Sequence, residues 1–172
     1  YFANITTGAV SVRGVVSGGN VADVAVSNRS GHTFAVDNNT KSIIEFSVAG
    51  AQLKTATFAT LLAKLAIDRT TARIIALSPG GPSTPATVLV LNEATLATVA
   101  TFPLVSGSVS SVCTVNGTAY IATNAGGAGT VSMFQIATAT NLTTPVTMSI
   151  AGAPVYVTGD GLSLAVYSTG SD

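Results

Sequence analysis

Acidic and imidazole side chains are the groups with which this chain could perform acid–base or metal chemistry, and they are few. His32 is the only histidine, so a zinc site built from several histidines is excluded. Because it follows a turn glycine, we expect an exposed imidazole with no catalytic role. The aspartates near predicted strand ends or turns, where carboxylates accept hydrogen bonds from backbone amides, are Asp23, Asp37, Asp68, Asp160 and Asp172.

Motifs for metal binding, phosphate binding and catalysis are missing from the sequence. A calcium site at Asp37 with Asn38 and Asn39, or at Asp160, would need about six to eight oxygen ligands, which isolated acids do not show. Paired acids at a hydrolase spacing and a Gly-x-Ser-x-Gly elbow are absent. The glycine-rich run at Gly126–Gly129 precedes a predicted strand rather than a helix. We predict no enzyme, no catalytic residue, no metal and no cofactor.

Cys113 is the single cysteine, so an internal disulfide framework is excluded. It lies in the middle of a predicted strand with apolar neighbours and no basic residue that would lower its pKa. We therefore expect a core residue rather than a reactive thiol.

Covalent modification is the one chemical signal above background. Five asparagines match the Asn-x-Ser/Thr acceptor pattern for N-glycosylation: Asn4, Asn28, Asn38, Asn116 and Asn141. Asn116 has a competing structural explanation, because Asn-Gly supplies the positive φ angles of a two-residue hairpin turn.

Asn116-Gly117 also marks a unit that recurs along the chain. The unit is an apolar run, a polar or glycine turn, and a second apolar run, found at Val24–Asn38, Leu65–Ser78, Val112–Asn124 and Val155–Ser168. An alanine inside each second run marks the period: Ala35, Ala76, Ala122 and Ala165. Recurrence every roughly 40–45 residues with four strands per unit is typical of β-propeller blades.

This period predicts one all-β domain over residues 1–172, a β-propeller with about four four-stranded blades. The blades are expected at 21–58, 61–102 and 109–150, with a half blade at 153–172. A helix across Ala56–Ile67 is the local alternative, because leucine, alanine and lysine favour it, but the repeat requires a strand at Leu65–Ile67. Small Ala25 and Ala66 suit inner strands near a crowded axis, whereas Tyr156 in the fourth inner strand does not.

Two short β-like runs within residues 1–16 have no hairpin partner before them. We expect these closing strands to complete the half blade, with Tyr1–Val16 pairing beside Val155–Ser168. The strands could close their own chain or the next copy, and the sequence does not choose between the two.

The hairpins resemble the YVTN-type β-propeller repeat of surface-layer and secreted proteins. The segments that carry the resemblance are Val157–Ser168, Val115–Asn124 and Ser30–Asn38, although no intact YVTN tetrapeptide occurs. The family usually forms seven-bladed rings, which 172 residues do not supply, so the resemblance implies a four-bladed ring or rings shared between subunits.

The amino-acid composition limits the classes of function that we expect for this chain. Charged residues are 8% of the chain, seven of each sign, so no basic field attracts nucleic acid. No apolar stretch is long enough to span a membrane. The neutral surface, rich in Thr, Ser and Asn, favours an extracellular or cell-surface structural protein that self-assembles into a fibre or layer, with other copies as partners. The alternative is a secreted glycan- or ligand-binding module, with Pro79–Pro85 and Ala125–Gly129 as candidate loops; a lactonase-like enzyme is least favoured.

Overall fold

A computed structural model describes residues 2–3, 10–11, 15–16, 19–79, 85–106, 108–125, 128–136, 146–150, 155–159 and 162–168. Within these ranges every regular element is a β-strand, and no helix occurs that could cross a lipid bilayer. The strands form three four-stranded antiparallel sheets and two two-stranded ones.

Each four-stranded sheet is a meander in chain order. The first sheet contains β3 (Val21–Val26), β4 (Thr33–Asp37), β5 (Ser42–Phe46) and β6 (Gln52–Thr57). The second contains β7 (Lys64–Asp68), β8 (Arg73–Ser78), β9 (Pro85–Asn92) and β10 (Thr98–Ser106). The third contains β11 (Ser108–Val115), β12 (Thr118–Ala125), β13 (Ala128–Gln135) and β14 (Val146–Ile150). A half-sheet of β15 (Val155–Gly159) and β16 (Leu164–Ser168) follows.

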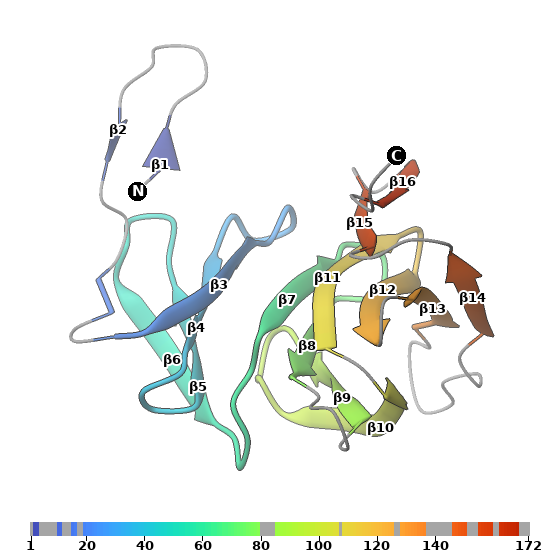
Figure 1. Ribbon diagram of the computed structural model, residues 1–172. Helices are drawn as coiled ribbons and strands as arrows, with labels where there is room; N and C mark the ends of the chain where they lie inside the picture. The colour runs from blue at the N-terminus through green and yellow to red at the C-terminus, as the bar shows by residue number, and fades with distance from the viewer. Residues whose placement is uncertain are drawn as a thin grey trace.

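The sheets are arranged as blades around an axis lined by their first strands (Figure 1). These inner strands lie against one another in sequence: β3 against β7, β7 against β11, and β11 against β15. We call the side of a sheet that faces the next sheet in the chain its forward face, and the opposite side its rear face. Since residues alternate between the two faces of a strand, a sheet with a neighbouring sheet on either side contributes to two cores.

Three apolar cores lie between successive sheets. Phe34 and Ile43 of the first sheet pack with Ile74 and Leu91 of the second. Between the second and third sheets, Phe102 meets Phe134 edge to face with ring centroids 4.7 Å apart. The third sheet and the half-sheet share a smaller core. Burial between neighbouring sheets, rather than within one sheet, therefore stabilises the fold.

Turn chemistry explains where the hairpins reverse. Asp37, Asp68 and Asn92 each accept backbone hydrogen bonds from the turn that follows. Those turns end at Lys41, Ala72 and Leu96, which adopt positive φ angles of 52°, 53° and 59°. Asn116 and Gly117, at 48° and 77°, form the predicted two-residue turn.

Two of the local predictions can be compared directly with these strands. The segment Ala56–Ile67 ends β6 and begins β7, so the strand interpretation is correct and the helix is not formed. The alanine markers, in contrast, do not share a face. Ala35 and Ala76 lie on rear faces, whereas Ala122 packs forward against the half-sheet. A one-residue offset in a strand exchanges its faces, so the period located the sheets without fixing their register.

Candidate association interface

The half-sheet has one covered face and one open face. Val155 and Val157 of β15 are buried against Cys113 and Val131 of the third sheet. Tyr156 and Thr158 alternate with them and therefore lie on the forward face, where no further sheet follows among the described strands. Their cross-strand partners in β16 are Tyr167 and Ala165.

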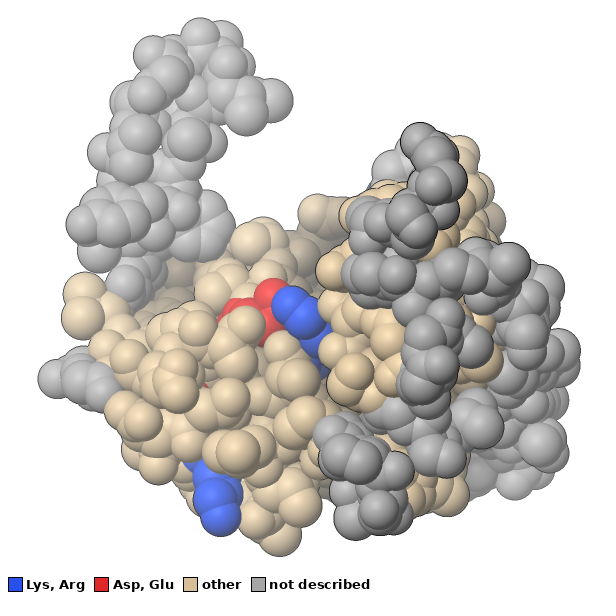
Figure 2. Space-filling view, viewed as in Figure 1, with Lys and Arg blue, Asp and Glu red and all other residues tan. Residues whose placement is uncertain are grey.

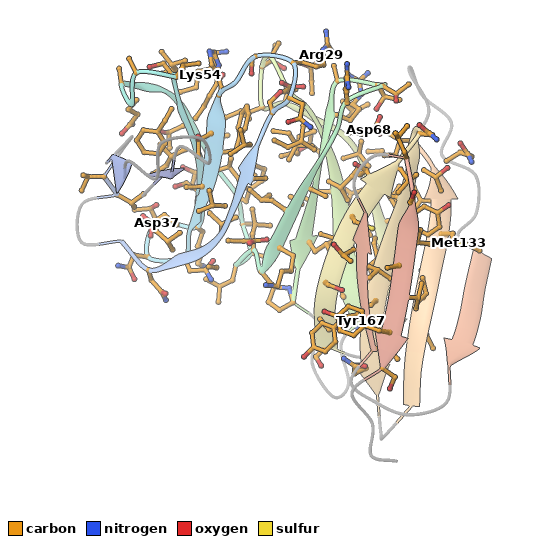
Figure 3. All side chains as sticks on the ribbon, turned by 90° about the horizontal axis from the view of Figure 1, so that it is seen from above. Arg29, Asp37, Lys54, Asp68, Met133 and Tyr167 are labelled. Carbon is orange, nitrogen blue, oxygen red and sulfur yellow. The ribbon has the colours of Figure 1, made fainter. Side chains whose placement is uncertain are left out.

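Two stacked tyrosines dominate this open face. The rings of Tyr156 and Tyr167 lie 5.4 Å apart with an interplanar angle of 19°. Tyr167 is 51% exposed, and Figure 3 shows it at the end of the sheets opposite Arg29, Lys54 and Asp68. Tyr156, which had no place at a crowded axis, is thus directed away from the third sheet and paired across the hairpin.

The first sheet has a rear face that is exposed at its inner strand and covered further out. On its rear face, Val24 and Val26 of β3 are 50% and 45% exposed. Further from the axis on the same face, Ala35, Ile44 and Phe46 form a buried cluster against which Val16 packs. The chain therefore presents apolar inner-strand residues at both ends of the series of sheets.

The expected closing strands do not complete the half-sheet within this chain. β1 (Phe2–Ala3) and β2 (Val10–Ser11) pair with each other as a separate two-stranded sheet. Among the described residues, β16 pairs with β15 alone. For β1 and β2, the strands described within Tyr1–Val16, the predicted pairing beside Val155–Ser168 is thus not formed within this chain; Figure 1 shows both strands on the side of the molecule where the first sheet lies, away from β15 and β16.

Polar side chains form hydrogen bonds between each inner strand and the next. Asp23 accepts a hydrogen bond from the Leu65 amide at 2.8 Å, between the first two sheets. Thr114 donates to the Ile67 carbonyl at 3.0 Å, and the Val157 amide donates to Ser111 at 2.7 Å. These bonds satisfy backbone groups that would otherwise be buried without partners.

A pocket of about 680 Å³ opens where the turns after the inner strands converge. Asn28, Asp68, Asn116 and Thr158 are among its polar lining, and none of the described residues that line it is aromatic. The described ends of the segments Pro79–Pro85 and Ala125–Gly129 lie where second strands end and third strands begin, at the opposite end of the sheets. The predicted loop site is therefore not at this pocket; residues 80–84 and 126–127 lie outside the described residues.

The predicted modification sites differ in accessibility. Asn28 and Asn116 are exposed at the axial pocket. Asn38 is half-buried, and its Oδ1 accepts a hydrogen bond from the Leu62 amide, which a glycan on the side-chain amide would crowd. Asn4 and Asn141 lie outside the described residues, so glycosylation stays a prediction.

The aspartates that the structure describes serve the backbone. Asp37 accepts from the Asn20 and Asn39 amides and from the Thr40 hydroxyl, and these bonds hold the pKa of its carboxyl below the ordinary value. Asp68 accepts from the Thr71 amide and, across the sheets, from the Gly117 amide. Within the described ranges no three potential ligands gather to hold a metal, and Asp160 and Asp172 are outside them.

A charged cluster between the first two sheets was missed from sequence. His32 is not a free exposed imidazole: its Nδ1 lies 2.7 Å from Oε1 of buried Glu45, and Lys54 is 3.3 Å from the other oxygen. Beside it, the Ser27 hydroxyl donates to buried Glu93. Cys113 is buried as predicted, and burial raises the pKa of its thiol to about 11.

No known protein family and no curated protein matches the sequence. Solved structures do match the fold. The RRP9 WD40 repeats align with a TM-score of 0.62 at 14% identity, covering 81% of this chain and 42% of that one. U3-55K aligns with a TM-score of 0.63 at 14% identity, covering 87% of this chain and 52% of that one. Sqt1 of Saccharomyces cerevisiae aligns with a TM-score of 0.65 at 12% identity, covering 88% of this chain and 44% of that one.

The chain thus spans about half the length of these WD40 proteins, with coverage of 42–52% of each. At such low identity the likeness concerns architecture alone. It shows that the chain has a β-propeller fold.

Proposed function

We propose that this chain is an extracellular structural protein that self-assembles into a surface fibre or layer. The observation that carries the proposal is the half-sheet, whose forward face and outer edge have no neighbouring strand among the described residues. A propeller blade has four strands, and an uncovered sheet edge is a template for pairing with another chain. We further propose kinship with YVTN-type repeats of the cell surface.

Surface charge supports association. The chain has seven basic and seven acidic residues and a net charge of zero, so long-range repulsion between copies is weak. In the view of Figure 2 most of the described surface is uncharged, with one cluster of acidic and basic residues near the centre and one basic group at the lower left. Long-range repulsion therefore opposes the approach of two copies only weakly.

Strand exchange offers a route to assembly. If β1 and β2 of one copy completed the half-sheet of the next, every copy would donate two strands and accept two. Such a head-to-tail contact closes into a ring or continues as a filament.

Sedimentation of the untagged chain at increasing micromolar concentration tests the proposal. We expect species larger than 17.0 kDa whose fraction rises with concentration. A single 17.0 kDa species that persists at every concentration would overturn self-assembly.

A secreted glycan- or ligand-binding module is the second candidate, favoured by the axial pocket. Its polar lining could hydrogen-bond a small polar ligand, although its described lining offers no aromatic platform for a sugar ring. Binding on a glycan array that is lost in Thr158→Val, with wild-type melting retained, would favour this function over the structural one.

A further inference from the structure

The contacts between inner strands form a series with two ends. Within the chain, the forward face of each sheet meets the rear face of the next, three times in succession. Among the described sheets, the series begins at the rear face of β3 and ends at the forward face of β15. They are therefore one forward face and one rear face, the same two kinds of face that pack together at each of the three internal interfaces.

The exposed side chains at both ends suit such a contact. The stacked rings of Tyr156 and Tyr167 form a broad apolar surface with hydroxyl groups at its rim. Val24 and Val26, side by side on one face of β3, form a smaller apolar surface. None of these four positions carries a charge, so their burial leaves no ion without a partner.

We propose that the Tyr156–Tyr167 stack of one copy packs against Val24 and Val26 of the next copy. This inference rests on the proposed self-assembly and specifies which two surfaces meet between copies; we call this contact the seam. The occupant is a second copy because the seam continues the forward-to-rear order of the three internal interfaces. A tyrosine stack against another tyrosine stack would instead join two forward faces, an arrangement that none of the described sheets adopts.

Variants that block one of the two association surfaces test this contact between copies. Tyr167→Asp removes the forward surface of a copy and Val24→Asp removes the rear surface, and both residues are about half exposed. Burying an unpaired carboxylate is unfavourable, so each variant alone should need at least about tenfold higher concentration to associate. An equimolar mixture should form heterodimers of twice 17.0 kDa that grow no further, because each pair retains one intact seam.

Val99→Asp is the matched control, since Val99 is a 39% exposed valine in β10, away from both surfaces. It should associate like the wild type, and circular dichroism should show that all variants stay folded. If Tyr167→Asp is monomeric while Val24→Asp still assembles, the contact joins two tyrosine stacks and the head-to-tail seam is wrong. If both variants assemble like the wild type, this inference fails while self-assembly stands. A monomeric wild type would overturn both.

Discussion

Replacement of Asp68 should loosen the junction between the second and third sheets. The carboxylate is 2% exposed, and it accepts hydrogen bonds from the Thr71 amide at 2.7 Å, the Thr71 hydroxyl at 2.6 Å and the Gly117 amide at 3.2 Å. The last of these crosses between the sheets. In Asp68→Ala both amides lose their partner, and the Gly117 amide is buried.

The expected loss follows from those amides. A buried donor left without a partner costs about 1–3 kcal/mol, so Asp68→Ala should lower the free energy of unfolding by about 2–4 kcal/mol. For a chain of this length, that corresponds to a fall in Tm of about 5–15 °C. Asp68→Asn keeps the volume but replaces one acceptor oxygen with a donor, so it should still cost about 1–2 kcal/mol.

Urea unfolding followed by circular dichroism measures these differences. Thr71→Val is the control, because it removes the hydroxyl bond alone and should cost about 1 kcal/mol. Asp68→Ala within about 0.5 kcal/mol of the wild type would refute the reasoning. An Asp68→Asn variant as stable as the wild type would show that shape matters and the acceptor does not.

Three further outcomes are expected. The Thr40 hydroxyl and nearby amides lower the pKa of Asp37 from 3.8, so the stability that the ionised carboxylate contributes is complete above pH 3.8 and is lost as the pH falls through the lowered pKa. The free energy of unfolding that Asp37→Asn loses in urea melts should therefore become smaller in acid. The thiol of Cys113, with its pKa raised to about 11, should react with a thiol reagent at pH 8 only after denaturant is added, and rapid reaction of the native protein would contradict its burial. Lys41→Gly, at a φ of 52°, should raise the stability by up to about 1 kcal/mol, whereas Gly117→Ala, at 77°, should lower it by about as much; melting curves compare the two signs.

The sheets could be predicted from the sequence because their turns are coded locally. Asn116-Gly117 dictates a tight reversal whatever surrounds it, and Asp37 and Asp68 shape their turns through amides within three residues. Four such hairpins at a regular period leave few arrangements other than stacked blades.

The exposed face of the half-sheet and the polar contacts within and between the sheets could not be predicted, because they depend on how the strands pair and on which faces of the sheets pack together. The face of Tyr156 is decided by the packing of Val155 and Val157 on the third sheet. His32 finds Glu45 only after β4 and β5 pair, and Ser27 meets Glu93 across 66 residues. No local pattern in the chain encodes these encounters.

The bonds between inner strands have a consequence for divergence among the repeats. Asp23, Ser111 and Thr114 all reach backbone amides or carbonyls of the neighbouring strand, never its side chains. Any residue that keeps an extended backbone can serve as the receiving partner, except that proline cannot donate. At these three junctions the side chain of the receiving residue can therefore change without loss of the hydrogen bond, so the repeats can diverge in sequence there while keeping the same stacking.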